Sequence, residues 1–230
     1  MTTRGLPAPG ISVVGFEGTG KTRFWTTAAK PIVCVSTDTN TETTVRDILR
    51  CDEDVIILHQ VSMPALAFEE RDEVKEGGEQ KWDATRAFLG PYLKTDDRHR
   101  PKALVLDTAS DVFDLRVLGE FGKLDQIPPE VRRNMMGRCN ISYKGIIQAF
   151  KDRGIMVILV HRAKEKWVDA TQRTQRGLEE IRKRLDGPFD MEREGFKGTG
   201  FISSLELYLT FDPNRATRDG LSEHAALAVE

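Results

Sequence analysis

The chain contains the glycine-rich stretch Gly15-Phe16-Glu17-Gly18-Thr19-Gly20-Lys21-Thr22. It matches the pattern G-x-x-x-x-G-K-[ST] in full, follows the apolar run 11–14 and opens a segment with helical spacing. Glycines let such a loop curl until successive backbone N–H groups point inward at phosphate oxygens. The start of the next helix adds free N–H groups and the positive end of its dipole. The stretch therefore predicts a phosphate-binding P-loop between a strand and a helix.

Two side chains of this loop have predicted roles of their own. Lys21 is expected to reach the β- and γ-phosphates, and the Thr22 hydroxyl to ligate Mg²⁺. The absence of an N-K-x-D motif from the sequence favours ATP over GTP, so the predicted cofactors are ATP and Mg²⁺. The predicted nucleotide-binding residues are Gly15, Glu17, Gly18, Thr19, Gly20, Lys21, Thr22 and Arg23.

Apolar runs and helical segments alternate along the chain. The apolar runs are 11–14, 32–35, 55–58, 103–106, 155–160 and 205–211, and the segments with helical spacing are 21–29, 42–49, 82–93, 110–121 and 129–153. Short, continuous runs rich in Val and Ile are typical of strands buried on both faces of a parallel sheet. The alternation predicts an α/β fold with a mainly parallel twisted sheet and helices on both faces.

Two segments fall outside this alternation of apolar runs and helical segments. The acidic stretch 62–80 is predicted to be a solvated loop or an insertion. Residues 162–200 carry many charges and little apolar periodicity, which indicates a long functional or mobile loop. We therefore predict one domain over 1–212 and a polar tail over 213–230.

An acidic residue ends one of the predicted strands. The apolar run 103–106 is followed by Asp107. Open α/β sheets place their ligands at the carboxyl ends of the strands, and a magnesium site beside a P-loop needs a second, acidic anchor. We therefore predict that Asp107 holds Mg²⁺ together with Thr22, although an aspartate here could instead cap the helix of 110–121.

Hydrolysis also requires a group that positions water. Thr108, not an acid, follows the magnesium aspartate, so the predicted catalytic acid is Asp38 at the end of the second strand, with Glu42 as a nearby substitute. Asp38 could instead cap the following helix. His161 ends the strand 155–160, where a polar residue would lie beside the γ-phosphate and report whether ATP or ADP is bound. A strand-end histidine can also be purely structural.

Composition sets limits on the other functions. The chain has 230 residues, 39% of them apolar and 30% charged, which suits one soluble domain with a core. A net charge of −2 gives no general attraction to nucleic acid or membrane, so such a partner would need a local patch. Cys34, Cys51 and Cys139 have no C-x-x-C spacing, which argues against a disulfide framework or a zinc site. With no signal segment and no long apolar stretch, we expect an intracellular protein without a membrane partner.

Taken in order, these residues resemble the RecA-like recombinase ATPases, and among them the short phage-encoded RecA-like proteins that assist single-strand annealing and recombination. The resemblance covers most of the chain, from the P-loop through Asp38 and Asp107 to the segment 198–211, which looks like a closing hairpin. It implies a RecA-like core, a bacterial or phage-infected cytoplasm, and assembly into a homo-oligomeric ring or filament. It further implies that Asp38 activates water and that His161 senses the γ-phosphate. The chain has Asp38 where the family usually has Glu, and His161 where it usually has Gln.

The resemblance also implies that 162–200 is a mobile loop that binds DNA, with Lys197 or Arg193 of a neighbouring protomer reaching the γ-phosphate. The local charge supports this interpretation. Between Arg162 and Arg184 the sequence has eight basic and four acidic residues, and between Arg132 and Lys144 it has four basic residues and no acidic one. Such clusters predict a track for single-stranded DNA, on which Trp167 could stack a base. The predicted DNA-binding residues are Arg132, Arg133, Arg138, Arg162, Lys164, Lys166, Arg173, Arg176, Arg182, Lys183 and Arg184.

Other interpretations stay open. The basic residues could be a solvated helix face, with Glu179 and Glu180 pairing with the cations of 182–184 at helical spacing. A small-molecule kinase also uses a P-loop, and the region 173–184 could form its lid. A non-catalytic loader that binds ATP and a protein partner, such as a single-strand-binding or recombination protein, would agree with Asp38 in place of Glu.

Overall fold

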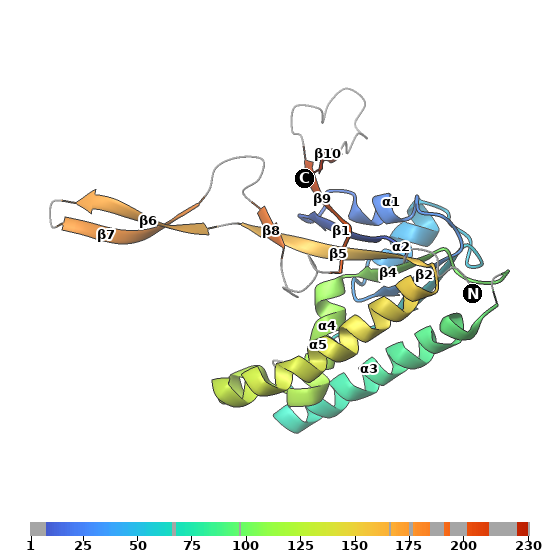
Figure 1. Cartoon of the computed structure of the whole chain (residues 1–230), viewed down its shortest axis with the longest axis horizontal. Helices are drawn as coiled ribbons and strands as arrows, with labels where there is room; N and C mark the ends of the chain where they lie inside the picture. Colours follow the sequence, from blue (N-terminus) through green and yellow to red (C-terminus); the bar gives the residue numbers. More distant parts are fainter. Residues whose placement is uncertain are drawn as a thin grey trace, which may run out of the picture.

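A twisted, mainly parallel sheet lies at the centre of the computed structural model, which describes residues 8–65, 68–96, 98–165, 167–174, 177–184, 191–193, 202–211 and 225–229 (Figure 1). Its strand order is β10-β9-β1-β5-β4-β2-β3. Within this order the neighbouring strands pair in parallel except β10, which is antiparallel to β9. The strands are β1 (Gly10–Gly15), β2 (Ile32–Ser36), β3 (Ile56–Gln60), β4 (Ala103–Asp107), β5 (Met156–Glu165), β9 (Leu205–Phe211) and β10 (Ala225–Val229).

Helices cover both faces of this sheet (Figure 1). The first face carries α1 (Lys21–Trp25), α2 (Thr41–Thr43) and the π-helix η1 (Thr44–Ile48), and the second carries α3 (Arg71–Lys94), α4 (Ala109–Phe121), the 3-10 helix η2 (Leu124–Gln126) and α5 (Pro129–Asp152). The predicted α/β fold class, a mainly parallel twisted sheet with helices on both faces, is confirmed. Among the described residues, no helix is both long and apolar enough to cross a membrane.

The central strands are buried on both faces, which explains their unbroken apolar sequences. Successive residues of β5 alternate between two core clusters: Val157 and Leu159 pack with α3, α4 and α5, whereas Ile158 and Val160 pack on the side of α1. In β4, Leu106 likewise belongs to the first cluster and Val105 to the second. This alternation decides which side chain at each strand end faces which helical layer.

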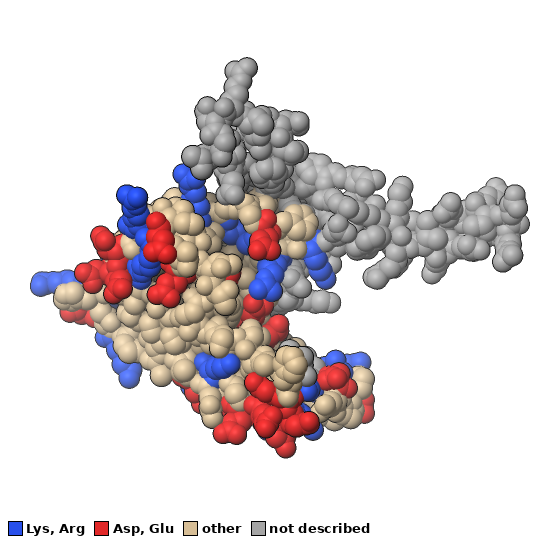
Figure 2. Space-filling view, turned by 180° about the vertical axis from the view of Figure 1, so that it is seen from behind, with Lys and Arg blue, Asp and Glu red and all other residues tan. Residues whose placement is uncertain are grey.

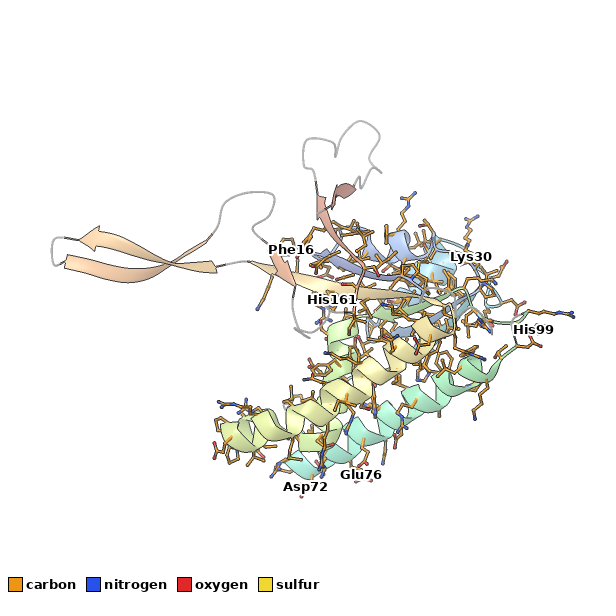
Figure 3. The ribbon with its side chains drawn as sticks, in the orientation of Figure 1. Phe16, Lys30, Asp72, Glu76, His99 and His161 are labelled. Atoms are coloured by element: carbon orange, nitrogen blue, oxygen red, sulfur yellow. The ribbon has the colours of Figure 1, made fainter. Side chains whose placement is uncertain are left out.

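Helix α3 begins at Arg71, so residues 71–80 of the stretch predicted to be a solvated loop or an insertion belong to a helix and not to a loop. A capping box starts the helix: the N-cap Glu70 and Glu73 each accept a hydrogen bond from the other's backbone N–H. The acidic residues are exposed, and Figure 2 shows acidic side chains gathered at this end of the helical layer, where Figure 3 places Asp72 and Glu76. Buried residues recur at Val74, Gly78, Trp82, Thr85 and Leu89, one stripe along the helix.

Two other helices differ in extent or type from those that the sequence predicted. Helix α1 ends at Trp25 although the helical spacing continued to residue 29. The hydroxyls of Thr26 and Thr27 donate to the carbonyl oxygens of Arg23 and Phe24 at 2.8 and 2.7 Å, and such side-chain bonds compete with further helix formation. The segment predicted as one helix over 42–49 is a single turn, α2, followed by the π-helix η1.

The region predicted as a loop over 162–200 contains strands wherever the structure describes it. Strand β5 continues to Glu165, and β6 (Trp167–Thr174) pairs with β7 (Gly177–Arg184) in an antiparallel hairpin that extends away from the sheet (Figure 1). Strand β8 (Met191–Arg193) returns to pair with the outer part of β5. Residues 225–229 of the predicted polar tail form β10, which is antiparallel to β9. Residues 205–211 of the segment 198–211, expected to be hairpin-like, form β9, which pairs in parallel with β1.

Candidate functional site

The predicted P-loop lies between β1 and α1. Gly18 and Gly20 have φ angles of 77° and 81°, a left-handed conformation that favours glycine. Gly15 is needed for a different reason, because a Cβ atom there would collide with the Thr19 hydroxyl oxygen. That hydroxyl donates to the carbonyl oxygen of Phe16 at 2.8 Å and closes the loop on itself.

The ammonium group of Lys21 lies inside the loop. Its Nζ donates to the carbonyl oxygens of Gly15 and Phe16 at 2.9 and 2.6 Å. Burial lowers the pKa of Lys21 from its usual value, while the nearby carboxylates of Asp107, Asp38 and Glu17 act in the opposite direction. A cation held by carbonyl oxygens over a P-loop can exchange these partners for phosphate oxygens when an anion binds.

Asp107 ends β4 on the α1 side of the sheet, as its alternation with Leu106 requires. It is only 2% exposed, and its Oδ2 accepts a hydrogen bond of 2.9 Å from the indole N–H of the fully buried Trp25. Burial raises the pKa of Asp107 to about 6, while the bond from Trp25 lowers it. The helix cap of α4 is Thr108, not Asp107, so the alternative interpretation of Asp107 as a cap is wrong.

Asp38 follows β2 at the same edge of the sheet. Its Oδ1 accepts a hydrogen bond of 3.0 Å from the Asn40 N–H, and its carbonyl oxygen accepts one of 2.6 Å from the Gln60 amide. The N-cap of α2 is Asn40, so Asp38 does not occupy the cap position that was its alternative role. Glu42, the substitute acid, is exposed on α2 and does not line the pocket described next.

These groups meet in one cavity of about 630 Å³ at the carboxyl edge of the sheet. A volume of this size suits a nucleotide-sized ligand. The lining includes the predicted residues Glu17, Gly18, Gly20, Lys21, Thr22, Arg23, Asp38 and Asp107. It also includes residues that the sequence did not single out: Phe16, Asn40, Thr44, Ile48, Leu49, Thr108 and Ala163. Gly15 and Thr19 shape the loop without lining the cavity.

The predicted sensor His161 does not reach this cavity. It is fully buried, and its Nδ1 lies 3.4 Å from the Ser110 hydroxyl of α4, on the sheet face opposite to α1 (Figure 3). The next residue, Arg162, lines the cavity instead. Side chains of a strand alternate between its two faces, so residue 162 lies on the same face as Val160, but the uniformly apolar run gave no sign of which face that is.

The predicted DNA-binding residues do not form one surface. Arg132, Arg133 and Arg138 lie on the N-terminal half of α5, which Figure 1 shows well apart from the β6–β7 hairpin. Lys164 is exposed on the outer part of β5. For Arg173, Arg182, Lys183 and Arg184, as for Trp167 and Arg193, the structure gives the strand position only. Lys166, Arg176 and Lys197 lie outside the described residues.

The geometry fits a magnesium–nucleoside triphosphate. Thr22 and Asp107 supply the hydroxyl and the carboxylate that would hold Mg²⁺, and a buried carboxylate whose pKa is raised gains from a nearby cation. Lys21 supplies positive charge for the phosphates. Asp38, which lines the same cavity from the end of β2, offers a carboxylate that could accept a proton from water.

Comparisons with known proteins add little to this geometry. No family model matches the sequence, and no curated protein matches it significantly. Among solved structures, the chain is similar to a prototypical ATPase from the type III secretion system of pathogenic bacteria, with 11% sequence identity and a TM-score of 0.43. The match covers 89% of this chain and 52% of the other, so the chain spans about half the length of that protein.

Proposed function

We propose that this chain is a magnesium-dependent ATPase of the P-loop class whose turnover is coupled to single-stranded DNA. The observation that supports the ATPase most directly is that Lys21, Asp38 and Asp107 line one cavity although Lys21 opens α1, Asp38 follows β2 and Asp107 ends β4. A P-loop that bound phosphate alone would not need two further carboxylates at the same edge of the sheet.

In the proposed reaction, water attacks the γ-phosphorus and the bond to the β–γ bridging oxygen breaks, leaving ADP and phosphate. Lys21 and the P-loop N–H groups balance the charge on the phosphate oxygens. Asp38 orients the water and takes up its proton, since Asn40 holds only one of the two carboxylate oxygens. Bound Mg²⁺ would stabilise charge on the β- and γ-phosphate oxygens.

The case for single-stranded DNA rests on the hairpin that continues β5. Only one residue separates Glu165, the end of β5, from Trp167, the start of β6. Arg182, Lys183 and Arg184 follow one another at the end of β7, and the register places Arg184 opposite Trp167. Basic residues and an aromatic residue at neighbouring positions of one hairpin suit a strand of nucleotides, whose phosphates attract cations and whose bases stack on aromatic rings. A recombination or annealing role and assembly into a ring or filament are part of the proposal.

The first test is ATP turnover with and without a single-stranded oligonucleotide, at low and moderate salt. We expect stimulation by the oligonucleotide that weakens as salt rises. Lys21→Ala should abolish turnover because it removes the cation nearest the phosphates. Retained turnover in this variant would contradict the assignment of the site.

The DNA-binding surface has its own test. Replacing Arg182, Lys183 and Arg184 together by Ala should weaken oligonucleotide binding and flatten its salt dependence, by about 0.7 in the logarithmic slope for each phosphate that is no longer neutralised. Replacing Arg132, Arg133 and Arg138 on α5 is the matched comparison, with the same loss of charge. Unchanged binding in the hairpin variant would remove the hairpin from the DNA-binding surface.

The two rival functions give different results in the same assays. A turnover rate that ignores oligonucleotides but yields a phosphorylated small molecule would indicate a kinase. Tight ATP binding with negligible turnover would indicate an ATP-dependent loader with a protein partner. The loader remains a rival because the carboxylate of Asp38 lies one methylene closer to the backbone than that of a glutamate, which changes its reach toward an attacking water.

A further inference from the structure

Arg162 occupies the position at which β5 leaves the sheet beside the P-loop. The register pairs it with Gly15, the first residue of the loop, while His161 pairs with Val14. Arg162 continues the face of β5 formed by Ile158 and Val160, and it lines the same cavity as Lys21 and Asp107. Burial acts most strongly on the pKa of both groups, lowering that of Lys21 and raising that of Asp107, and the charge of Arg162 makes a smaller contribution that lowers both.

The guanidinium is held by one carboxylate. Arg162 Nη2 donates to Asp111 Oδ2 at 3.1 Å, and the two side chains are 55% and 15% exposed. The same Oδ2 accepts a hydrogen bond of 3.1 Å from the Thr37 hydroxyl, which in turn accepts one of 3.1 Å from the Thr108 N–H. Asp111 is therefore fixed by the ends of β2 and β4, whereas Arg162 is the exposed and adjustable partner.

We propose that Arg162 binds the terminal phosphate of a nucleoside triphosphate within its own chain, and that Asp111 holds the guanidinium when that phosphate is absent. The proposal rests on the proposed nucleotide site. A guanidinium has five N–H donors in a planar fork that matches phosphate oxygens, and the bond to Asp111 uses one of them. Lys21 and Arg162, two cations at one cavity, repel each other, so an anion placed between them is favoured.

The test compares the affinities for a non-hydrolysable ATP analogue and for ADP, each with Mg²⁺, by calorimetry. Arg162→Gln should weaken analogue binding about 10- to 100-fold, the usual effect of one charge-assisted hydrogen bond, and change ADP binding less than about threefold. The affinity of Arg162→Lys for the analogue should lie between those of the unmodified protein and Arg162→Gln, since lysine keeps the charge but lacks the planar fork of N–H donors. The control is Arg86→Gln, because Arg86 is exposed to a similar extent as Arg162 and pairs with Asp83 outside the nucleotide cavity.

The variant Asp111→Asn distinguishes two roles of Arg162: binding a phosphate, or only forming an ion pair that holds Asp111. It removes the competing charge, so we expect analogue affinity to be retained or raised several-fold. If Arg162 served only to hold Asp111, this variant and Arg162→Gln would lose the same affinity, and the proposal would be wrong. Equal losses for analogue and ADP in Arg162→Gln would also overturn it. If the unmodified protein bound neither nucleotide, the proposed function itself would fail, which is a distinguishable result.

Discussion

Gly78→Ala should not give the gain in stability that alanine, the better helix former, usually brings to a helix interior. Gly78 lies in the interior of α3, where it meets Gly119 of α4 at the crossing of the two helices. A Cβ atom at residue 78 would lie 2.6 Å from the Gly119 nitrogen and 2.9 Å from the Leu118 carbonyl carbon. Both are backbone atoms, so the helices themselves would have to move apart.

The neighbouring residue provides the control for this substitution. Gly77 is in the same helix, but a Cβ atom there would meet nothing closer than the Pro64 side chain at 4.0 Å. Gly77→Ala should therefore show the gain in helix propensity alone, about 1 kcal/mol. Gly78→Ala has the same gain and an overpacking cost of about 1–3 kcal/mol. The difference between the two variants isolates the packing cost, because the propensity term cancels.

Urea unfolding followed by circular dichroism measures both variants against the unmodified protein. We expect the free energy of unfolding to rise for Gly77→Ala and to be lower than this for Gly78→Ala by about 1–3 kcal/mol. In thermal melts each kcal/mol corresponds to about 2–4 °C for a chain of this size. A Gly78→Ala protein as stable as Gly77→Ala would refute the close crossing of α3 and α4.

Two further predictions concern buried groups. Trp25→Phe removes the indole N–H that donates to Asp107 Oδ2, so it should lower the free energy of unfolding by about 2–4 kcal/mol and weaken Mg²⁺-dependent nucleotide binding. The control is Trp82→Phe, at a buried tryptophan of the other core cluster, which should leave nucleotide binding unchanged. Equal effects of the two variants on binding would contradict the role of the Trp25 indole. A hydrophilic alkylating reagent should modify the Cys51 thiol rapidly in the native protein. It should modify Cys34 and Cys139 only after unfolding, because these two thiols are buried and burial raises the pKa of each. Mass spectrometry after brief labelling measures this order, and early labelling of Cys34 would be inconsistent with its place in the sheet.

The sequence was sufficient for the phosphate loop and for the two carboxylates beside it. Both kinds of signal are local: a fixed spacing of glycines before Lys21, and an acid directly after an apolar strand. Parallel strands bring their carboxyl ends to one edge, so Asp38 and Asp107 meet wherever the sheet forms. No knowledge of packing was needed to place them.

The start of α3 could not be predicted in the same way. Acidic residues around Gly77 and Gly78 are typical of a loop, and glycine lowers helix propensity. What stabilises this part of the helix is the contact with α4, for which residue 78 must be small. The glycine that argued against a helix locally is thus required by the tertiary structure. The β6–β7 hairpin was missed because its polar strands lack the alternation that identifies a half-buried strand.

Strand β5 explains why the sequence pointed to His161 although the next residue, Arg162, lines the cavity. The run 155–160 is apolar throughout because both faces of the strand are buried, so the sequence carries no alternation that says which face each residue occupies. It could therefore indicate where the strand leaves the core but not which of the next two side chains faces the P-loop. A shift of one residue in a strand exchanges its two faces. Once Val160 is known to pack on the α1 side, Arg162 must follow it toward the cavity, and His161 must point to Ser110. The residue suited to contact a terminal phosphate is accordingly the arginine, and the buried histidine links β5 to α4.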